Sequence, residues 1–195
     1  SKPDEYYSQR NNRLYPHEAC TPTSFVMALD VIDVELPGPA RPNRQPEDYL
    51  MSVLLGKVGM SMRDEMTPWF STQDRETPPN EIHTVVAAVV NYLVGRLVCR
   101  WYRYESVDAL GGTAWMRLQI DKGRPLTVSG GVGSLQGHTL CVVGYMLDRD
   151  AAGEEFQVGW ILDDPYGDPR GDYNVPHGNG VVMDQKSFLS QWSGH

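Results

Sequence analysis

Residues 9–29, QRNNRLYPHEACTPTSFVMAL, set the first element of the fold, because a polar, turn-rich segment here gives way to a helical pattern. From Cys20 onward, apolar residues recur at four- and three-residue steps, which predicts one apolar face on a helix: Phe25, Leu29 and Ile32, with Val26 beside them. Residues 1–19 are predicted to form an extended polar arm. The thiol of Cys20 therefore lies at a predicted helix start.

Three further helices and four strands are predicted along the rest of the chain. Helical patterns cover residues 46–60 (ending near Gly56 or Gly59), 81–97 (with Asn80 as N-cap) and 107–123. After Arg124 the pattern becomes strand-like, in residues 125–130, 138–148, 154–164 and 178–184. Helices thus come first and an antiparallel sheet second, which predicts an α+β fold with the N-terminal helix packed on the sheet.

Composition excludes several classes of protein. The 195 residues fit a single domain spanning 1–195, and no apolar run reaches the eighteen residues of a membrane span. A net charge of −8 argues against nucleic acid and anionic membranes as partners. The start of the chain lacks a signal-peptide pattern, so we expect synthesis in the cytoplasm. No cofactor is implied by any motif.

Three cysteines are too few and too irregular for a disulfide framework or a zinc site. Their number is odd and no CxxC pair occurs. Cys99 and Cys141 fall in apolar runs and are predicted to lie in the core. Cys20 is left as the candidate reactive thiol.

A thiol at a helix start is placed for nucleophilic chemistry. The positive end of the helix and a neighbouring imidazolium both favour the thiolate, which is the attacking form. The free N–H groups of the first turn, together with a side-chain amide, can bind the oxyanion that forms. Gln9 is the nearest upstream candidate for that amide. The alternative for Cys20 is a buried structural cysteine.

Two later segments supply candidate partners. His138 follows the segment SGGVGSLQG (residues 129–137), which is predicted to form a glycine-rich loop. His138 is then predicted to open a strand at the sheet edge, with room for substrate. The segment WILDDPYG ends a strand in Asp163 and Asp164, either of which can orient an imidazole. Strand alternation lets only one of the two face His138, and a shift of one residue would swap them.

Together these segments resemble the C39-like group of papain-fold cysteine peptidases. The matching segments, in chain order, are QRNN with CTPTSFVMAL, then GHTLCVVGYMLD, ILDDPYGD and SFLSQW. They cover roughly residues 6–33 and 126–192, whereas residues 34–125 carry no motif of the group. One departure is Thr21, which stands where Gly or Asn is usual and brings a branched side chain close to the thiol.

The resemblance implies a papain-like fold and a role for each matched residue. Cys20 would be the nucleophile, His138 the general base and then acid, Asp164 the orienting carboxylate and Gln9 the oxyanion donor. No metal is implied. The substrate would be a peptide, and the related cell-wall lytic modules of bacteria and phages suggest peptidoglycan stem peptides. In that case the chain would be one module of a longer protein, with a separate wall-binding domain.

Other functions remain open from the sequence. The same chemistry suits a leader-trimming peptidase or a transpeptidase, and the same fold suits a non-catalytic peptide-binding module. Calcium is a further alternative for the 163–174 loop, which lacks EF-hand spacing. His17 is predicted to point to solvent and His83 to cap a helix or lie on the surface. Trp69, Trp101 and Trp115 are predicted to lie in the core or to line a groove.

Overall fold

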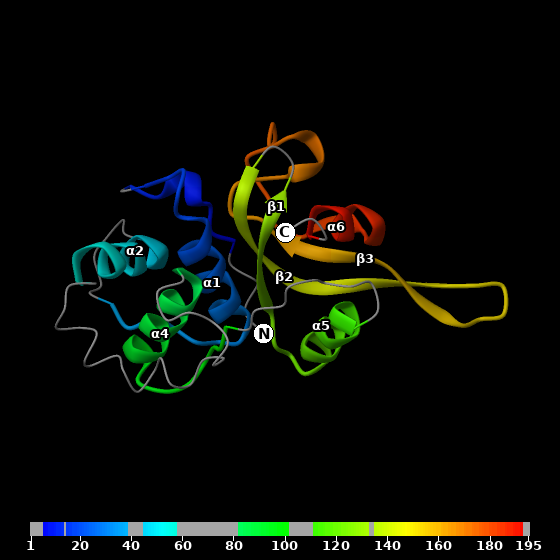
Figure 1. The fold of residues 1–195 in the computed structure, drawn as a ribbon, viewed down its shortest axis with the longest axis horizontal. Coiled ribbons are helices and arrows are strands. Elements are labelled where there is room, and N and C mark those ends of the chain that lie inside the picture. The colour runs from blue at the N-terminus through cyan, green and yellow to red at the C-terminus, as the bar shows by residue number, and fades with distance from the viewer. Residues whose placement is uncertain are drawn as a thin grey trace.

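The computed structural model describes residues 6–13, 15–38, 45–57, 82–101, 111–132 and 135–192. Within these ranges a group of helices lies beside an antiparallel sheet, as predicted (Figure 1). Among the described helices, none has the length and apolar character needed to cross a bilayer. The elements are η1 (Gln9–Asn11), α1 (Cys20–Val31), α2 (Pro46–Lys57), α4 (Ile82–Val94), α5 (Gly111–Asp121), β1 (Leu126–Val132), β2 (Leu135–Arg149), β3 (Glu155–Asp163), η2 (Pro169–Gly171), β4 (Val181–Asp184) and α6 (Gln185–Trp192).

The helical part is built on α1, α2 and α4. Phe25 and Leu29 of α1, Leu50 of α2 and Val86 and Val89 of α4 share one apolar cluster. The four apolar residues predicted to face inward from α1 all contact this cluster. The helix is nevertheless buried on more than one face, since its polar residues 21, 23 and 24 are also inaccessible. This happens because α1 lies between the other helices and the sheet (Figure 1).

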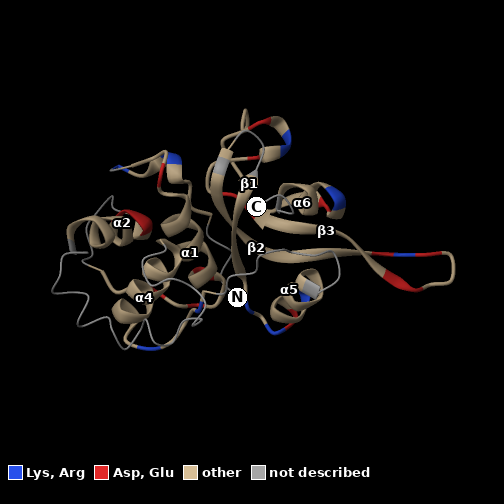
Figure 2. Cartoon of the chain, in the orientation of Figure 1, with Lys and Arg blue, Asp and Glu red and all other residues tan. Residues whose placement is uncertain are grey.

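The sheet has the strand order β1-β2-β3-β4, with every neighbouring pair antiparallel. A second apolar cluster lies on it, in which the fully buried Trp160 of β3 packs against Phe188 of α6 and Met116 of α5 joins from another helix. The β2–β3 hairpin continues well beyond this body as a two-stranded ribbon (Figure 1). In Figure 2, Lys and Arg are scattered over the described elements and the distal ribbon carries both signs.

Most predicted element limits agree with the structure. The helix α2 is described as far as Lys57, so it continues past Gly56, and the predicted alternative end at Gly59 lies outside the described residues. The helix α5 is followed by a turn at Gly123, whose φ is +68°. Asn80, Trp69 and the start of the helix predicted from residue 107 lie outside the described residues.

Candidate active site

Cys20 is the first residue of α1, at the end of the helix that faces the sheet. Ala19 precedes it as N-cap and offers no side-chain hydrogen bond to the helix, whose first internal bond runs from Thr23 N–H to the Ala19 carbonyl. Since Pro22 has no N–H, the free donors of the first turn belong to Cys20 and Thr21. The predicted placement of the thiol at a helix N-terminus is what the structure shows.

His138 lies inside β2 rather than at its beginning. The strand starts at Leu135, and His138 pairs with Gly130 of β1, so the predicted position at the first strand residue was wrong. The reason is that the glycine-rich segment 129–137 mostly continues β1 and β2 as paired strands, with a register shift between Gly130 and Val132, instead of forming a long loop. The His138 side chain is only 3% exposed, so it does not stand at an open sheet edge.

Asp164 follows the last residue of β3 and contacts His138. Its Oδ1 lies 2.7 Å from His138 Nε2, and the carboxylate is fully buried. Asp163, the other candidate, instead accepts a hydrogen bond from the Gly180 N–H through its Oδ1, at 2.8 Å. Because Nε2 is used by Asp164, the ring nitrogen left for Cys20 is Nδ1.

The three side chains form one chain of contacts, from the partly exposed Cys20 through the buried His138 to the buried Asp164. Burial by itself lowers the pKa of His138, but hydrogen bonds to Asp164 and Cys20 outweigh it and raise that pKa to about 9. Burial by itself raises the pKa of Cys20, but hydrogen bonds from His138, the Thr139 backbone and Thr21, with the charge of His138, lower that pKa overall. The contact between Cys20 and His138 thus favours the thiolate and the imidazolium over the neutral forms of the two groups.

Thr21 and Thr139, which follow the thiol and the imidazole in the chain, hold their two elements together. Their Oγ1 atoms are 3.0 Å apart and buried, and Ser24 of α1 donates to the Thr139 carbonyl at 3.0 Å. The Thr21 side chain is therefore engaged with β2, and its hydroxyl also favours the Cys20 thiolate. The departure of Thr21 from the pattern of the resembling group thus has a local structural role.

Gln9 is buried at the edge of the site, and its side-chain amide is hydrogen-bonded to Pro16. It is 1% exposed, its backbone N–H donates to the Pro165 carbonyl at 2.9 Å, and its Nε2 donates to the Pro16 carbonyl at 2.9 Å. That bond uses one of the two Nε2 protons. The arm predicted as extended therefore contains the η1 turn and is anchored next to Asp164, where Tyr6 Oη also donates to the Asp164 carbonyl at 2.8 Å.

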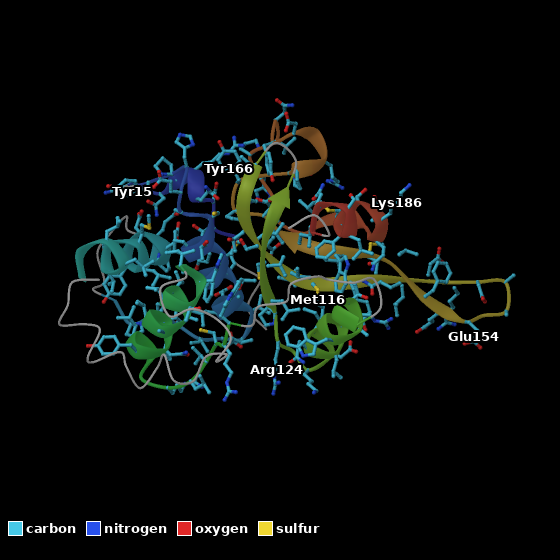
Figure 3. All side chains as sticks on the ribbon, viewed as in Figure 1. Tyr15, Met116, Arg124, Glu154, Tyr166 and Lys186 are labelled. Carbon is cyan, nitrogen blue, oxygen red and sulfur yellow. The ribbon has the colours of Figure 1, made fainter. Side chains whose placement is uncertain are left out.

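Aromatic residues that the sequence did not single out surround the pair of His138 and Asp164. Tyr166 and Tyr173 present T-shaped contacts to the imidazole, with ring centroids 6.4 and 6.0 Å away. In Figure 3, Tyr166 lies where the N-terminal segment meets the sheet part. No local sequence signal marks these tyrosines, because they approach His138 only through the path of the loop after β3.

The remaining candidates lie as follows. His17 is exposed, as predicted, whereas His83 is half-buried, stacks on Trp101 with centroids 4.2 Å apart and has Nε2 3.3 Å from Thr139 Oγ1. His83 is therefore part of the packing behind the site and not a cap or surface residue. Cys141 is fully buried, and Cys99 is partly buried with its pKa raised to about 12 by burial.

Three carboxylates of the acidic 163–174 segment have hydrogen-bond partners within the protein. Asp168 is bound by Arg170, while Asp163 and Asp164 have the partners given above. Within the described ranges, no group of three or more His, Cys, Asp or Glu residues is arranged to hold a metal ion.

Comparison with known proteins found no matching family model, no matching curated protein and no matching solved structure. The proposals below therefore rest on the residues of this chain.

Proposed function

We propose that the protein is a cysteine peptidase that hydrolyses amide bonds through Cys20, His138 and Asp164. The observation that carries the proposal is the chain of contacts in which the buried Asp164 binds the buried His138 at 2.7 Å and His138 binds a partly exposed thiol at the first residue of a helix. Each residue type and contact in this chain is what nucleophilic thiol catalysis requires. A papain-like arrangement of α1 against the sheet is part of the same proposal.

The proposed reaction begins with the Cys20 thiolate attacking the carbonyl carbon of a peptide bond. The resulting oxyanion is bound by the free Cys20 N–H at the start of α1 and by the remaining Nε2 proton of Gln9. The His138 imidazolium gives its proton to the leaving amine, and an acyl-thioester on Cys20 remains. Neutral His138 then takes a proton from water, which attacks the thioester and restores the thiolate and the imidazolium.

Peptidoglycan stem peptides are the substrate that we propose first. This choice follows the resemblance of the four sequence segments to C39-like peptidases of cell-wall lytic proteins. Leader-trimming of another protein uses the same site and is the outcome to consider if wall peptides are not cleaved.

The decisive experiment compares the wild type with Cys20→Ala on purified peptidoglycan fragments, with products identified by mass spectrometry. We expect a new cleavage product with the wild type and at least a hundredfold less with Cys20→Ala. Cys99→Ala is the matched control, because it removes a thiol whose pKa is raised and which lies away from His138. Full turnover by Cys20→Ala would refute the proposal.

The chemistry is also tested without a substrate. Iodoacetamide should alkylate Cys20 well below the pH at which an ordinary thiol reacts, because the attacking form is the thiolate. An ordinary thiol profile for Cys20 would refute the thiolate–imidazolium pair.

A further inference from the structure

The carboxylate of Asp164 has a donor on each of its oxygens. Oδ1 accepts from His138 Nε2 at 2.7 Å and from the Tyr166 N–H at 2.9 Å, and Tyr173 Oη donates to Oδ2 at 3.4 Å. Burial and the nearby charge of Asp164 raise the pKa of Tyr173, so its hydroxyl keeps the proton that it donates. Tyr173 is thus the donor on the oxygen that faces away from His138.

The ring of Tyr173 also contacts the imidazole. It meets His138 in a T-shaped arrangement at 6.0 Å and Tyr166 at 5.3 Å, and the residue is only 6% exposed. One side chain therefore contacts both His138 and Asp164. The ring of Tyr173 excludes water from the hydrogen bond between His138 and Asp164, and that bond is stronger where the local dielectric is low.

The backbone at this position is held in an unfavourable conformation. Asp172 and Tyr173 have φ values of 51° and 63°, in the left-handed region that side chains with a Cβ rarely adopt. Two hydrogen bonds hold Tyr173 in this conformation. The Tyr173 N–H donates to the Asp168 carbonyl at 3.0 Å, and Arg10 Nη2 donates to the Tyr173 carbonyl at 2.9 Å. Strained residues of this kind persist where the surrounding contacts require them, and they gather at functional sites.

We infer that Tyr173 is a positioning residue of the proposed peptidase site. Its hydroxyl fixes the plane of the Asp164 carboxylate so that Oδ1 faces His138 Nε2, and its ring shields that contact from water. This inference rests on the proposed function, and it adds a residue that acts through Asp164 without touching the substrate.

The test measures how fast iodoacetamide alkylates Cys20 as a function of pH, with the Cys20 peptide followed by mass spectrometry. Tyr173→Phe removes only the hydroxyl and keeps the ring. Without the hydroxyl, the Asp164 carboxylate can rotate away from His138 Nε2. The imidazolium is then less stabilised, and because the imidazolium favours the Cys20 thiolate, the thiolate is less stabilised as well. We expect the acid limb of the profile to move up by about half to one pH unit, which makes the rate at pH 5 about three- to tenfold lower.

A double-mutant cycle separates positioning from a general structural role. If Tyr173 acts through Asp164, then adding Tyr173→Phe to Asp164→Asn should leave the Asp164→Asn profile unchanged. Tyr145→Phe is the matched control, because Tyr145 also donates to a carboxylate, that of Asp121, but at an exposed site outside the triad. It should leave the profile of the wild type unchanged.

The possible outcomes distinguish this inference from the proposed function. Suppose that Cys20 of the wild type reacts at low pH, but that Tyr173→Phe leaves the acid limb of the profile in place or moves it to lower pH. That result would overturn the inference and leave the peptidase proposal standing. Additive effects of the two substitutions would overturn it as well. An ordinary thiol profile in the wild type would overturn both the inference and the peptidase proposal.

Discussion

Glu47 provides a sharp test of how burial controls ionisation in this fold. It lies in the first turn of α2, is fully buried, and neither carboxylate oxygen has a hydrogen-bond partner on another described residue. Burial raises the pKa of Glu47 from 4.5 to about 8, against the backbone N–H of Glu47 itself, which lowers it, and with a smaller upward contribution from the charge of Asp48. The folded protein therefore keeps this proton at neutral pH, whereas the unfolded chain releases it.

The sign and size of the effect follow from this difference. Between pH 4.5 and about 8 the folded state binds one more proton than the unfolded state, so the free energy of unfolding falls as pH rises. Each pH unit costs about 1.4 kcal/mol, which adds up to on the order of 5 kcal/mol across the interval. The contribution is fully present below pH 4.5 and is lost as pH rises through that window. Such a loss is comparable with the whole stability of many domains, about 5–15 kcal/mol.

The perturbation that isolates this term is Glu47→Gln, which keeps the shape and stays neutral at every pH. Urea unfolding, followed by tryptophan fluorescence from pH 5 to pH 8, gives the free energy of unfolding of both proteins. We expect the two to agree within about 1 kcal/mol at pH 5, and the variant to be more stable by about 4 kcal/mol at pH 8. Glu154→Gln, in the exposed turn of the β2–β3 hairpin (Figure 3), should show no such pH-dependent difference. A Glu47→Gln difference that stays constant across this range would refute the reasoning.

Three further predictions concern the site. The rate of peptide hydrolysis should fall as pH rises through about 9, because His138 there loses the proton that it gives to the leaving amine. A profile of kcat/KM from pH 5 to 10 measures this fall, and a basic limb near pH 6.5 would contradict the prediction. Thr21→Val removes the hydroxyl that bonds Thr139 and favours the Cys20 thiolate. Alkylation of Cys20 by iodoacetamide at pH 5 should therefore slow about three- to tenfold. An unchanged rate would contradict this role of Thr21. Gly178→Ala places a Cβ in a clash with the Asp164 carbonyl oxygen and should lower the free energy of unfolding, measured in urea, by about 2 kcal/mol or more. Gly171→Ala, with open space around its Cβ, should change that free energy by less than about 1 kcal/mol. Equal effects of the two substitutions would contradict the close packing of Gly178 against Asp164.

The sequence was sufficient for the elements whose signals are local. The helix start at Cys20 is marked by the polar segment before it and by the apolar spacing after it, and both are properties of adjacent residues. The change from helical to alternating patterns after Arg124 likewise predicted the sheet, whose four strands overlap the predicted ranges. These features need no knowledge of which segments meet in space.

Features that depend on register or on distant contacts were not predictable in the same way. Strand alternation alone does not decide which of Asp163 and Asp164 faces His138, and Asp164 was favoured only by the resemblance to the peptidase group. In the structure the path of the chain after β3 separates the two carboxylates. The glycines before His138 favoured a loop, but pairing between β1 and β2 outweighed that local preference. Tyr173 is separated from Asp164 by a turn whose left-handed residues carry no sequence signature.

The division of the fold into two apolar clusters explains why polar contacts are concentrated at the site. Cys20 belongs to a helix that packs in one cluster, whereas His138 lies in a strand of the sheet that supports the other cluster, and Asp164 directly follows the end of β3 in that sheet. Apolar packing alone would allow α1 to slide on β2, since dispersion contacts are not directional. The buried bonds of Thr139 to Thr21 and Ser24 are directional, and a slip would leave their polar groups unsatisfied. Because Thr21 and Thr139 directly follow Cys20 and His138, the bond that fixes the helix on the sheet also fixes the thiol on the imidazole.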